Sequence, residues 1–308
     1  MRSRTSSLVR CTQGPLRPLP ARRRELSCGV DFLRTDEGLA SGQVCLVVFL
    51  PDAVRSRLVG PIELWVGERT GCVPVARGRV SYTEEALDRF YPGVADRFPE
   101  GWPLFAGLFA TGPCLATLWF GADASRVIPG VKGATHPARC TGSTIRGRFW
   151  CDNPTANLVH VSDDGEAAIR QLQVLRSLEP ELFRGRVPTR ALAPFDDAGP
   201  ATPAHSGILT LCSLVTTHLS SRGSAFAQLE VPELGEARET MARAEAWLGQ
   251  VLEHTPHGMA EAIHSYLKGT ASPSSCVSAL KDAVPVDSWQ ELILRAGVLS
   301  RGEWLEGR

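Results

Sequence analysis

Two neighbouring segments decide how this chain is interpreted: Gly142-Ser-Thr-Ile-Arg146-Gly-Arg-Phe149 and Asn157-Leu-Val-His160-Val-Ser162-Asp163. Within about twenty residues they place an arginine, an amide, a histidine and a hydroxyl, just before a long helical pattern. Arginine binds phosphate oxygens through its planar fork of donors, and a neutral imidazole can attack phosphorus. The two segments therefore favour a phosphate-handling site that contains Arg146 and His160.

The composition narrows the classes to which the protein can belong. The 308 residues, 43% hydrophobic and 21% charged, are typical of a globular protein with one large domain or two ordinary ones. Lys+Arg and Asp+Glu number 33 each, so the charge indicates neither a nucleic acid nor a membrane as partner. No apolar run approaches the roughly 20 residues of a membrane-spanning helix. The nine cysteines include no Cys-x-x-Cys pair, which argues against a disulfide framework and a structural zinc site.

The N-terminal region has the composition of a leader. Residues 1–28 contain seven arginines and no acidic residue before Glu25, as in organellar transit peptides. Three prolines in this region interrupt any long amphipathic helix, so a disordered basic tail is the alternative. We predict that residues 1–40 lie outside the fold. The protein is then expected in the mitochondrion or another organelle if the leader is a transit peptide, and in the cytoplasm otherwise.

The next part of the chain alternates between strand and helix patterns. Residues 44–50 form a continuous apolar run typical of a strand buried on both faces. Residues 72–82 suit a strand that Pro74 confines to a sheet edge or a strand end, and further strands are expected at 113–120 and 158–161. Helices are expected at residues 55–66, 83–91, 102–109, 122–128 and 162–178. This order predicts an α+β fold, with helices packed on an antiparallel sheet.

The C-terminal third differs in character. Residues 183–206 are rich in proline and glycine and read as a linker, whereas residues 207–308 are helical in pattern. Helices are expected at 236–254, 259–267, 275–283 and 287–299, and Asp287 and Gln290 predict a capping box at the start of the last one. On one of them His257, Glu261 and His264 share a face at a spacing that can bind zinc, but such a solvated polar face is more often unremarkable. The pattern does not indicate a function for this helical appendage, and a protein partner is the one role that we propose for it.

The ordered motifs resemble the nucleoside diphosphate kinase family over about residues 43–178. Val48-Phe-Leu-Pro-Asp52-Ala-Val54 resembles the family's opening Lys-Pro-Asp-Gly-Val segment, and Phe105-Ala-Gly-Leu108 resembles the turn beside its base pocket. The resemblance implies a ferredoxin-like four-stranded sheet in a domain of residues 41–182, and commonly a homo-oligomer. It also implies transfer of the γ-phosphate of a nucleoside triphosphate to a nucleoside diphosphate through a phosphohistidine at His160, with Mg²⁺ bound to the nucleotide.

The resemblance assigns further residues to this site. The nucleotide and its phosphates would be bound by Tyr91, Leu104, Arg126, Thr135, Arg146 and Asn157. Supporting roles fall to Asp52, Ser162 and Gln171. The distance along the chain between Arg126 and Thr135 is three residues longer than in the family.

Four departures from the family pattern bear on activity. Leu50 stands where the family has a lysine beside the transferring phosphate, and Gln171 stands where a glutamate polarises the histidine. Val161 replaces a glycine, and Leu104 replaces a base-stacking phenylalanine. Losing a positioned charge removes transition-state stabilisation, so the sequence predicts a weakened kinase. The alternative is a catalytically degenerate nucleotide-binding or scaffold protein that acts through its helical appendage.

Overall fold

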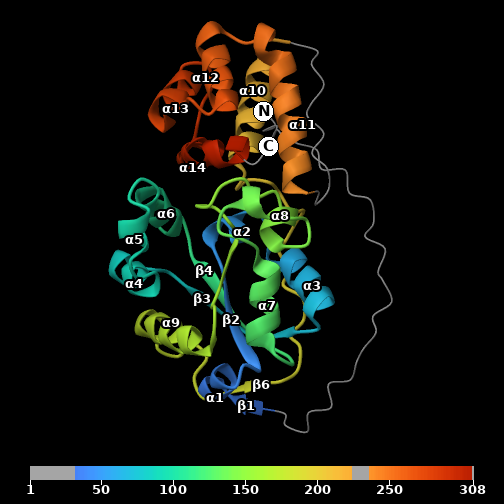
Figure 1. Cartoon of the computed structure of the whole chain (residues 1–308), viewed down its shortest axis with the longest axis vertical. Coiled ribbons are helices and arrows are strands. Elements are labelled where there is room, and N and C mark those ends of the chain that lie inside the picture. The colour runs from blue at the N-terminus through green and yellow to red at the C-terminus, as the bar shows by residue number, and fades with distance from the viewer. Residues whose placement is uncertain (1–31, 224–235, 307–308) are drawn as a thin grey trace, which may run out of the picture.

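A computed structural model describes residues 32–223 and 236–306. At its centre lies a four-stranded antiparallel sheet in the order β3-β4-β2-β5 (Figure 1). Its strands are β2 (Val44–Phe49), β3 (Val73–Val80), β4 (Cys114–Phe120) and β5 (Val159–Val161). This arrangement confirms the predicted α+β fold, and β3, which contains Pro74, lies at an edge as predicted.

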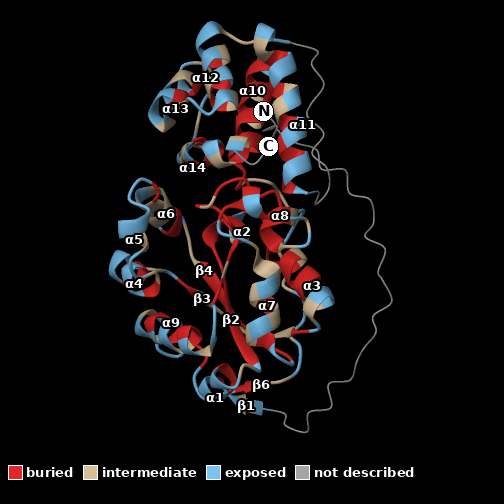
Figure 2. Ribbon diagram, viewed as in Figure 1, coloured by how far each residue is buried: buried red, intermediate tan, exposed pale blue. Residues whose placement is uncertain are grey.

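Strand β2 is the middle of the core. All six of its residues are apolar and buried, so both of its faces must be covered (Figure 2). Cys45, Val47 and Phe49 belong to one apolar cluster, and Leu46 and Val48 belong to the other. Helices therefore pack on both sides of the sheet.

The helices divide between these two faces. Helices α3 (Val59–Thr70) and α7 (Ala124–Lys132) pack in the cluster that contains Phe49. The opposite cluster includes side chains from α1 (Thr35–Ala40), α4 (Glu84–Phe90), α6 (Trp102–Phe109) and α9 (Gly165–Leu178). The short helices of this region are α2 (Pro51–Arg55), α5 (Val94–Arg97), η1 (Pro137–Arg139) and α8 (Ile145–Arg148).

Helix α7 is longer than predicted. We expected it to end near Ile128 and a loop to begin at Gly130, but it continues through Pro129 to Lys132. A proline inside a helix lacks one backbone donor, which is normally unfavourable. Tertiary contacts outweigh that cost here, because Ala124 and Ile128 are buried in the core and Lys132 bonds to β5.

The predicted leader extends too far into the chain. Strand β1 (Phe32–Arg34) pairs antiparallel with β6 (Arg186–Pro188), and helix α1 follows it directly. Leu39 of α1 is fully buried, so residues 32–40 are part of the fold. Composition could not reveal this, because the pairing partner lies about 150 residues away in the sequence. Residues 1–31, which hold most of the predicted leader, lie outside the described residues.

The predicted linker is a packed segment that contains β6. The backbone N–H of Leu192 donates to Pro74 O at 2.8 Å, which ties it to strand β3. Glu63 and Arg77 form a buried ion pair, and Arg77 also donates to Ala193 O at 3.0 Å. Reading residues 183–206 as a linker was therefore wrong, because its polar composition hid specific contacts with the sheet domain.

The appendage is helical, as predicted, and shares its core with the sheet domain. One apolar cluster runs from Val47 and Phe49 of the sheet to Leu211, Leu248 and Leu294 of the appendage. Its helices are α10 (Gly207–Ser221), α11 (Ala237–Val251), η2 (Leu252–His254), α12 (His257–Lys268), α13 (Pro273–Lys281) and α14 (Ser288–Glu306). The start of α14 forms the predicted capping box, in which Asp287 and Gln290 each accept the other's backbone N–H.

A buried carboxylate joins the two regions. Asp152 accepts hydrogen bonds from Asn153 Nδ2 (2.8 Å), Ser206 Oγ (2.8 Å), Gly207 N (3.0 Å) and Ile208 N (2.8 Å). The last two are N–H groups of the first turn of α10, which have no acceptor within the helix itself, and a negative charge is favoured at this end. Asp152 therefore caps the central helix of the appendage from within the sheet domain.

His205 lies at the same junction and is fully buried. Its Nε2 is 2.7 Å from Phe149 O, which can only accept, so Nε2 carries the proton. Nδ1 is then free to accept from Ser56 Oγ at 3.0 Å. Burial lowers the pKa of His205 to about 4.

This lowered pKa predicts a loss of stability in acid. Between pH 6.5 and 4 the unfolded chain binds a proton at His205 that the folded chain does not, so stability falls as the pH falls. Relative to His205→Gln, the wild-type unfolding free energy should decrease by roughly 2 to 3 kcal/mol from pH 7 to pH 4.5. Urea unfolding at both pH values measures this difference. The matched variant His264→Gln, at an exposed position on α12, should keep the wild-type pH dependence. A parallel pH response in wild type and His205→Gln would contradict the prediction.

Candidate functional site

His160 lies on edge strand β5, opposite Val48 of β2. Its ring is half-buried and meets the rings of Phe90 and Tyr91 edge-on, at centroid distances of 5.0 and 5.1 Å. Tyr91 also contacts Phe105 of α6 at 5.1 Å, so β5 and α6 border the same space. Aromatic rings thus hold the imidazole in one orientation on its sheet.

Two polar side chains determine which nitrogen of His160 carries the proton. Nε2 lies 3.1 Å from Gln171 Oε1, and Ser162 Oγ donates to the same oxygen at 2.6 Å. An amide oxygen only accepts, so in this network Nε2–H is the donor and Nδ1 keeps its lone pair. The predicted group of His160, Ser162 and Gln171 is therefore assembled, with Nδ1 available as a nucleophile.

The surroundings also keep the imidazole neutral. Burial lowers the pKa of His160 to about 4; the hydrogen bond that the ring donates to Gln171 opposes this, and the charges of Lys132 and Arg146 add to it. At neutral pH the ring is thus uncharged, which is the form that can attack phosphorus.

Arg146 is buried, and carbonyl groups surround it. Its Nε donates to Asn157 O (3.2 Å), Nη1 to Gly133 O (3.2 Å) and Ala134 O (3.1 Å), and Nη2 to Asn157 Oδ1 (3.1 Å) and Val159 O (2.8 Å). A guanidinium has five N–H donors, and these five contacts use all of them. In this structure Arg146 fastens the loop that begins at Gly133 to β5, and a phosphate group would have to displace a carbonyl to reach it.

Asp52 binds the backbone of the residue directly before β5. Its Oδ2 accepts the backbone N–H of Leu158 at 2.8 Å, while Oδ1 is buried without a hydrogen-bond partner. Burial raises the pKa of Asp52 to about 7. Leu50, two residues earlier, is buried in the apolar cluster of α4 and α9, so no charge enters the site from that position.

The remaining predicted binding residues lie farther out. Arg126 is 76% exposed on α7 and forms an ion pair with Asp123 at 2.9 Å. Thr135 is exposed, and its carbonyl accepts from Asn157 Nδ2 at 3.5 Å. Leu104 is half-buried on α6. The structure thus gathers only part of the predicted set around β5, namely Asp52, Tyr91, Arg146, Asn157, His160, Ser162 and Gln171, and leaves Arg126 in contact with solvent.

Lys132 contacts Val161, the residue that follows His160, and the sequence pattern indicated no role for this lysine. Its Nζ donates to Val161 O at 3.2 Å and to Asp163 Oδ1 at 3.3 Å. Two features of the sequence could have drawn attention to it. Lys132 is one of only three lysines in the chain, and it lies between Arg126 and Thr135, where the chain is three residues longer than in the family. Because the helix was predicted to end near Ile128, Lys132 was not placed on α7 and its position beside β5 was not foreseen.

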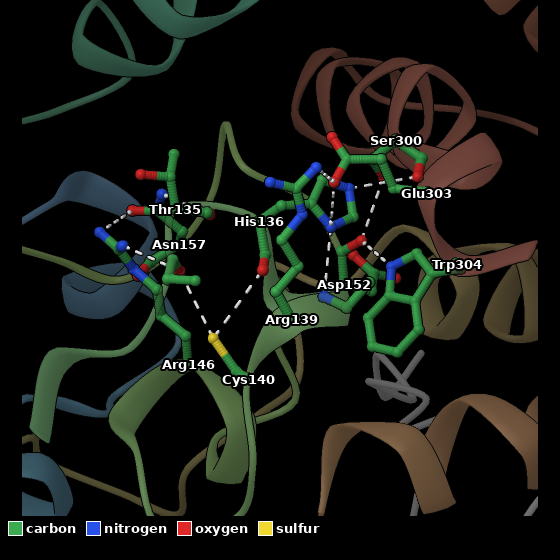
Figure 3. A network of polar contacts seen from close by, with 12 residues as sticks. Thr135, His136, Arg139, Cys140, Arg146, Asp152, Asn157, Ser300, Glu303 and Trp304 are labelled. Carbon is green, nitrogen blue, oxygen red and sulfur yellow. Dashed lines mark hydrogen bonds and ion pairs between the residues drawn. The ribbon is translucent and has the colours of Figure 1, made fainter. Parts of the chain in front are cut away.

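Helix α14 lies against the loop that follows α7 (Figure 3). His136 Nε2 is 3.2 Å from Ser300 O, and Arg139 forms an ion pair with Glu303 at 3.0 Å. Trp304 Nε1 donates to the backbone carbonyl of Asp152 at 2.7 Å, and Ser300 Oγ donates to it at 3.0 Å.

The N-terminal half of α14 packs against α6. Trp289 and Ile293 share the apolar cluster of Leu108 and Phe109. Leu292 lies so close to Gly107 that a Cβ on that glycine would be 3.4 Å from Leu292 Cδ1. Helix α14 therefore contacts both α6 and the loop 133–153. Helix α6 contains the segment that resembles the turn beside the family's base pocket.

The described residues contain no group of three or more His, Cys, Asp or Glu side chains that could hold a metal ion. His257 and Glu261 pair with each other at 3.2 Å on the exposed face of α12. In the described part of the chain, no helix has the length and apolar character to cross a membrane.

The family model for nucleoside diphosphate kinase matches residues 43–178. The chain is 38% identical over 125 residues to nucleoside diphosphate kinase 3 of Homo sapiens, covering 40% of this chain and 70% of that protein. It is 32% identical over 142 residues to a nucleoside diphosphate kinase of Symbiobacterium thermophilum, covering 45% and 90%. A solved apo structure of the Encephalitozoon cuniculi nucleoside diphosphate kinase aligns with a TM-score of 0.40 at 23% identity, covering 50% and 96%.

Proposed function

This chain belongs to the nucleoside diphosphate kinase family, and from that premise we propose that it moves the γ-phosphate of a nucleoside triphosphate to a nucleoside diphosphate through a phosphohistidine at His160. The observation that carries the proposal is the single free nitrogen of the ring. Because Gln171 Oε1 occupies Nε2–H, only Nδ1 presents a lone pair.

The proposed reaction has two balanced steps. In the first, Nδ1 attacks the γ-phosphorus, the N–P bond forms, and the bond to the β-phosphate oxygen breaks, which releases the diphosphate. In the second, a terminal oxygen of another nucleoside diphosphate attacks the same phosphorus, and the N–P bond breaks. The Nε2 proton stays on the ring throughout, where Gln171 binds it.

Magnesium fits this proposal as an ion that arrives with the nucleotide. Mg²⁺ prefers oxygen ligands and keeps several waters, and no described cluster of carboxylates would bind it alone. The phosphate oxygens of the nucleotide would therefore bind the ion in place of protein carboxylates. When bound, the ion neutralises part of the phosphate charge.

Two features support slow turnover. Leu50 brings no cation, and Gln171 orients the imidazole without stabilising the positive charge that develops on it during attack. A lysine at position 50 would bury a charge within an apolar cluster, so Leu50→Lys is a poor test of the site. Gln171 offers the cleaner substitution.

The alternative is a degenerate nucleotide-binding or scaffold protein. The observations that favour it are the full use of the Arg146 donors by protein groups and the position of α14 between α6 and the loop 133–153. In that case the fold would be kept for binding a partner through residues 207–308. A homo-oligomer is also a proposal, and light scattering would measure its size.

Labelling with γ-³²P-ATP separates these proposals. The kinase proposal expects acid-labile label that approaches one phosphate per chain, forms slowly, and is lost on addition of a nucleoside diphosphate. Nucleotide binding without label would favour the degenerate protein, and the absence of both would favour a scaffold. Rapid labelling with brisk transfer would contradict a weakened enzyme.

The variant Gln171→Glu should strengthen the site. A carboxylate would accept the same hydrogen bonds from His160 and Ser162 and add a negative charge, which favours the imidazolium. The pKa of His160 should therefore rise from about 4 toward its ordinary value, and the labelling rate should rise about tenfold. NMR titration of the ring and single-turnover labelling measure the two effects. The matched variant Gln171→Leu should lose labelling, and an unchanged His160 pKa in Gln171→Glu would contradict the assignment.

A further inference from the structure

A phosphoryl group on His160 would need a cation that the assigned residues do not provide. The transferred group carries about two negative charges beside a ring packed against two aromatic side chains. Arg146 already donates all five N–H groups to protein oxygens, and the only contact described for the exposed Arg126 is with Asp123, so nothing holds it at β5. Stabilising this charge therefore calls for another positively charged side chain.

Lys132 has the geometry for this role. It is the last residue of α7, and its side chain is 19% exposed. Its Nζ is held 3.2 Å from the carbonyl of Val161, the residue that follows His160. The only other contact described for Nζ is Asp163 at 3.3 Å. An ammonium has three donors, so these two contacts leave a third for a phosphoryl oxygen.

The ion pair between Lys132 and Asp163 does not prevent Lys132 from binding a phosphoryl group. The Asp163 side chain is 84% exposed, and an ion pair with a solvated carboxylate contributes little. A doubly charged phosphoryl group can replace that carboxylate while the carbonyl of Val161 continues to hold the ammonium. Helix α7 supports the position because Ala124 and Ile128 are buried in the core.

We propose that Lys132 binds the phosphoryl group carried by His160 and supplies the positive charge that Leu50 lacks. This inference rests on the proposed phosphohistidine. The charge of Lys132 already acts on the ring: burial is the largest cause that lowers the pKa of His160, the hydrogen bond to Gln171 opposes it, and Lys132 lowers the pKa further.

Lys132→Met in the full chain tests the proposal. Its labelling rate with ATP should fall on the order of 10- to 100-fold, since one positioned charge is lost. Lys132→Arg should stay within about threefold of wild type, because the charge is kept. Lys281→Met, which removes a lysine paired with Glu291 in the appendage, should label like wild type. Equal labelling of Lys132→Met and wild type would overturn the proposal.

A second measurement does not depend on turnover. Inorganic pyrophosphate is titrated against the full chain, and the NMR signals of the His160 ring report binding. Lys132→Met should weaken binding about tenfold, whereas Asp163→Asn, which removes only a weak partner of the ammonium, should bind at least as tightly as wild type. Asp163→Asn also covers the case in which Lys132→Met fails to fold, and weaker binding there contradicts the proposal.

The two measurements separate this inference from the proposed function. A wild-type chain that takes no label but binds pyrophosphate through Lys132 overturns the phosphohistidine, and with it the carried phosphoryl group, but leaves Lys132 as a phosphate-binding residue. A labelled wild type with pyrophosphate binding insensitive to Lys132 overturns the inference alone. A chain that neither takes label nor binds pyrophosphate overturns both.

Discussion

Replacing His160 by glutamine should remove the acid-labile label that the wild-type chain takes from ATP, reducing it at least about a thousandfold. An amide nitrogen has no basic lone pair, so it cannot form the phosphoramidate bond. The amide can still contact Gln171, as Nε2 of the imidazole does at 3.1 Å, and the fold should therefore be preserved. Loss of label would then report the missing nucleophile.

Filter-bound label after quenching in base and in acid measures this prediction. His264→Gln, on the exposed face of α12, is the matched control and should label like wild type. Thermal unfolding of both variants confirms that they are folded. Label that persists in His160→Gln would place the phosphoryl group on another residue and contradict the proposed mechanism.

Replacing Asp152 by alanine should destabilise the whole chain by about 3 to 5 kcal/mol. Four donors, from Asn153, Ser206, Gly207 and Ile208, would lose their buried acceptor. The first turn of α10 would also lose its negative charge. Domains are stable by only about 5 to 15 kcal/mol, so this loss is a large part of the total.

Urea unfolding at pH 7 measures the effect, with Asp123→Asn as the control. Asp123 is exposed, pairs with Arg126 and has a left-handed backbone that asparagine also tolerates, so removal of its charge should change the unfolding free energy by less than about 1 kcal/mol. Because the appendage and the sheet share one core, the sheet and the helices should unfold in a single transition. A loss below about 1 kcal/mol in Asp152→Ala, or separate transitions in the wild type, would contradict the structural role assigned to Asp152.

Local patterns in the sequence predicted much of the fold. The apolar run at 44–50 became the buried central strand, and Thr83 caps α4 by accepting the N–H of Ala86. The capping box at Asp287 was also confirmed. These features depend on residues close together in the chain, whose preferences act before any distant contact forms.

The predictions that failed depend on contacts between distant parts of the chain. Residues 32–40 were read as leader, but β1 pairs with β6, about 150 residues away. Helix α7 was predicted to stop before Pro129, yet its buried face and the bond from Lys132 to β5 extend it. Composition and periodicity describe a segment by itself, so they could not predict what covers it.

By itself, the sequence determined the family, the choice of His160 as the proposed nucleophile and the absent charges at Leu50 and Gln171, because these follow from residue identity and order. Only the tertiary structure decided which side chains can act. It shows Arg146 occupied by five protein oxygens, Lys132 beside the residue that follows His160, and α14 against both α6 and the loop 133–153. The reason is that a donor is available only when no other group binds it, and those groups come from segments that meet only in the folded chain.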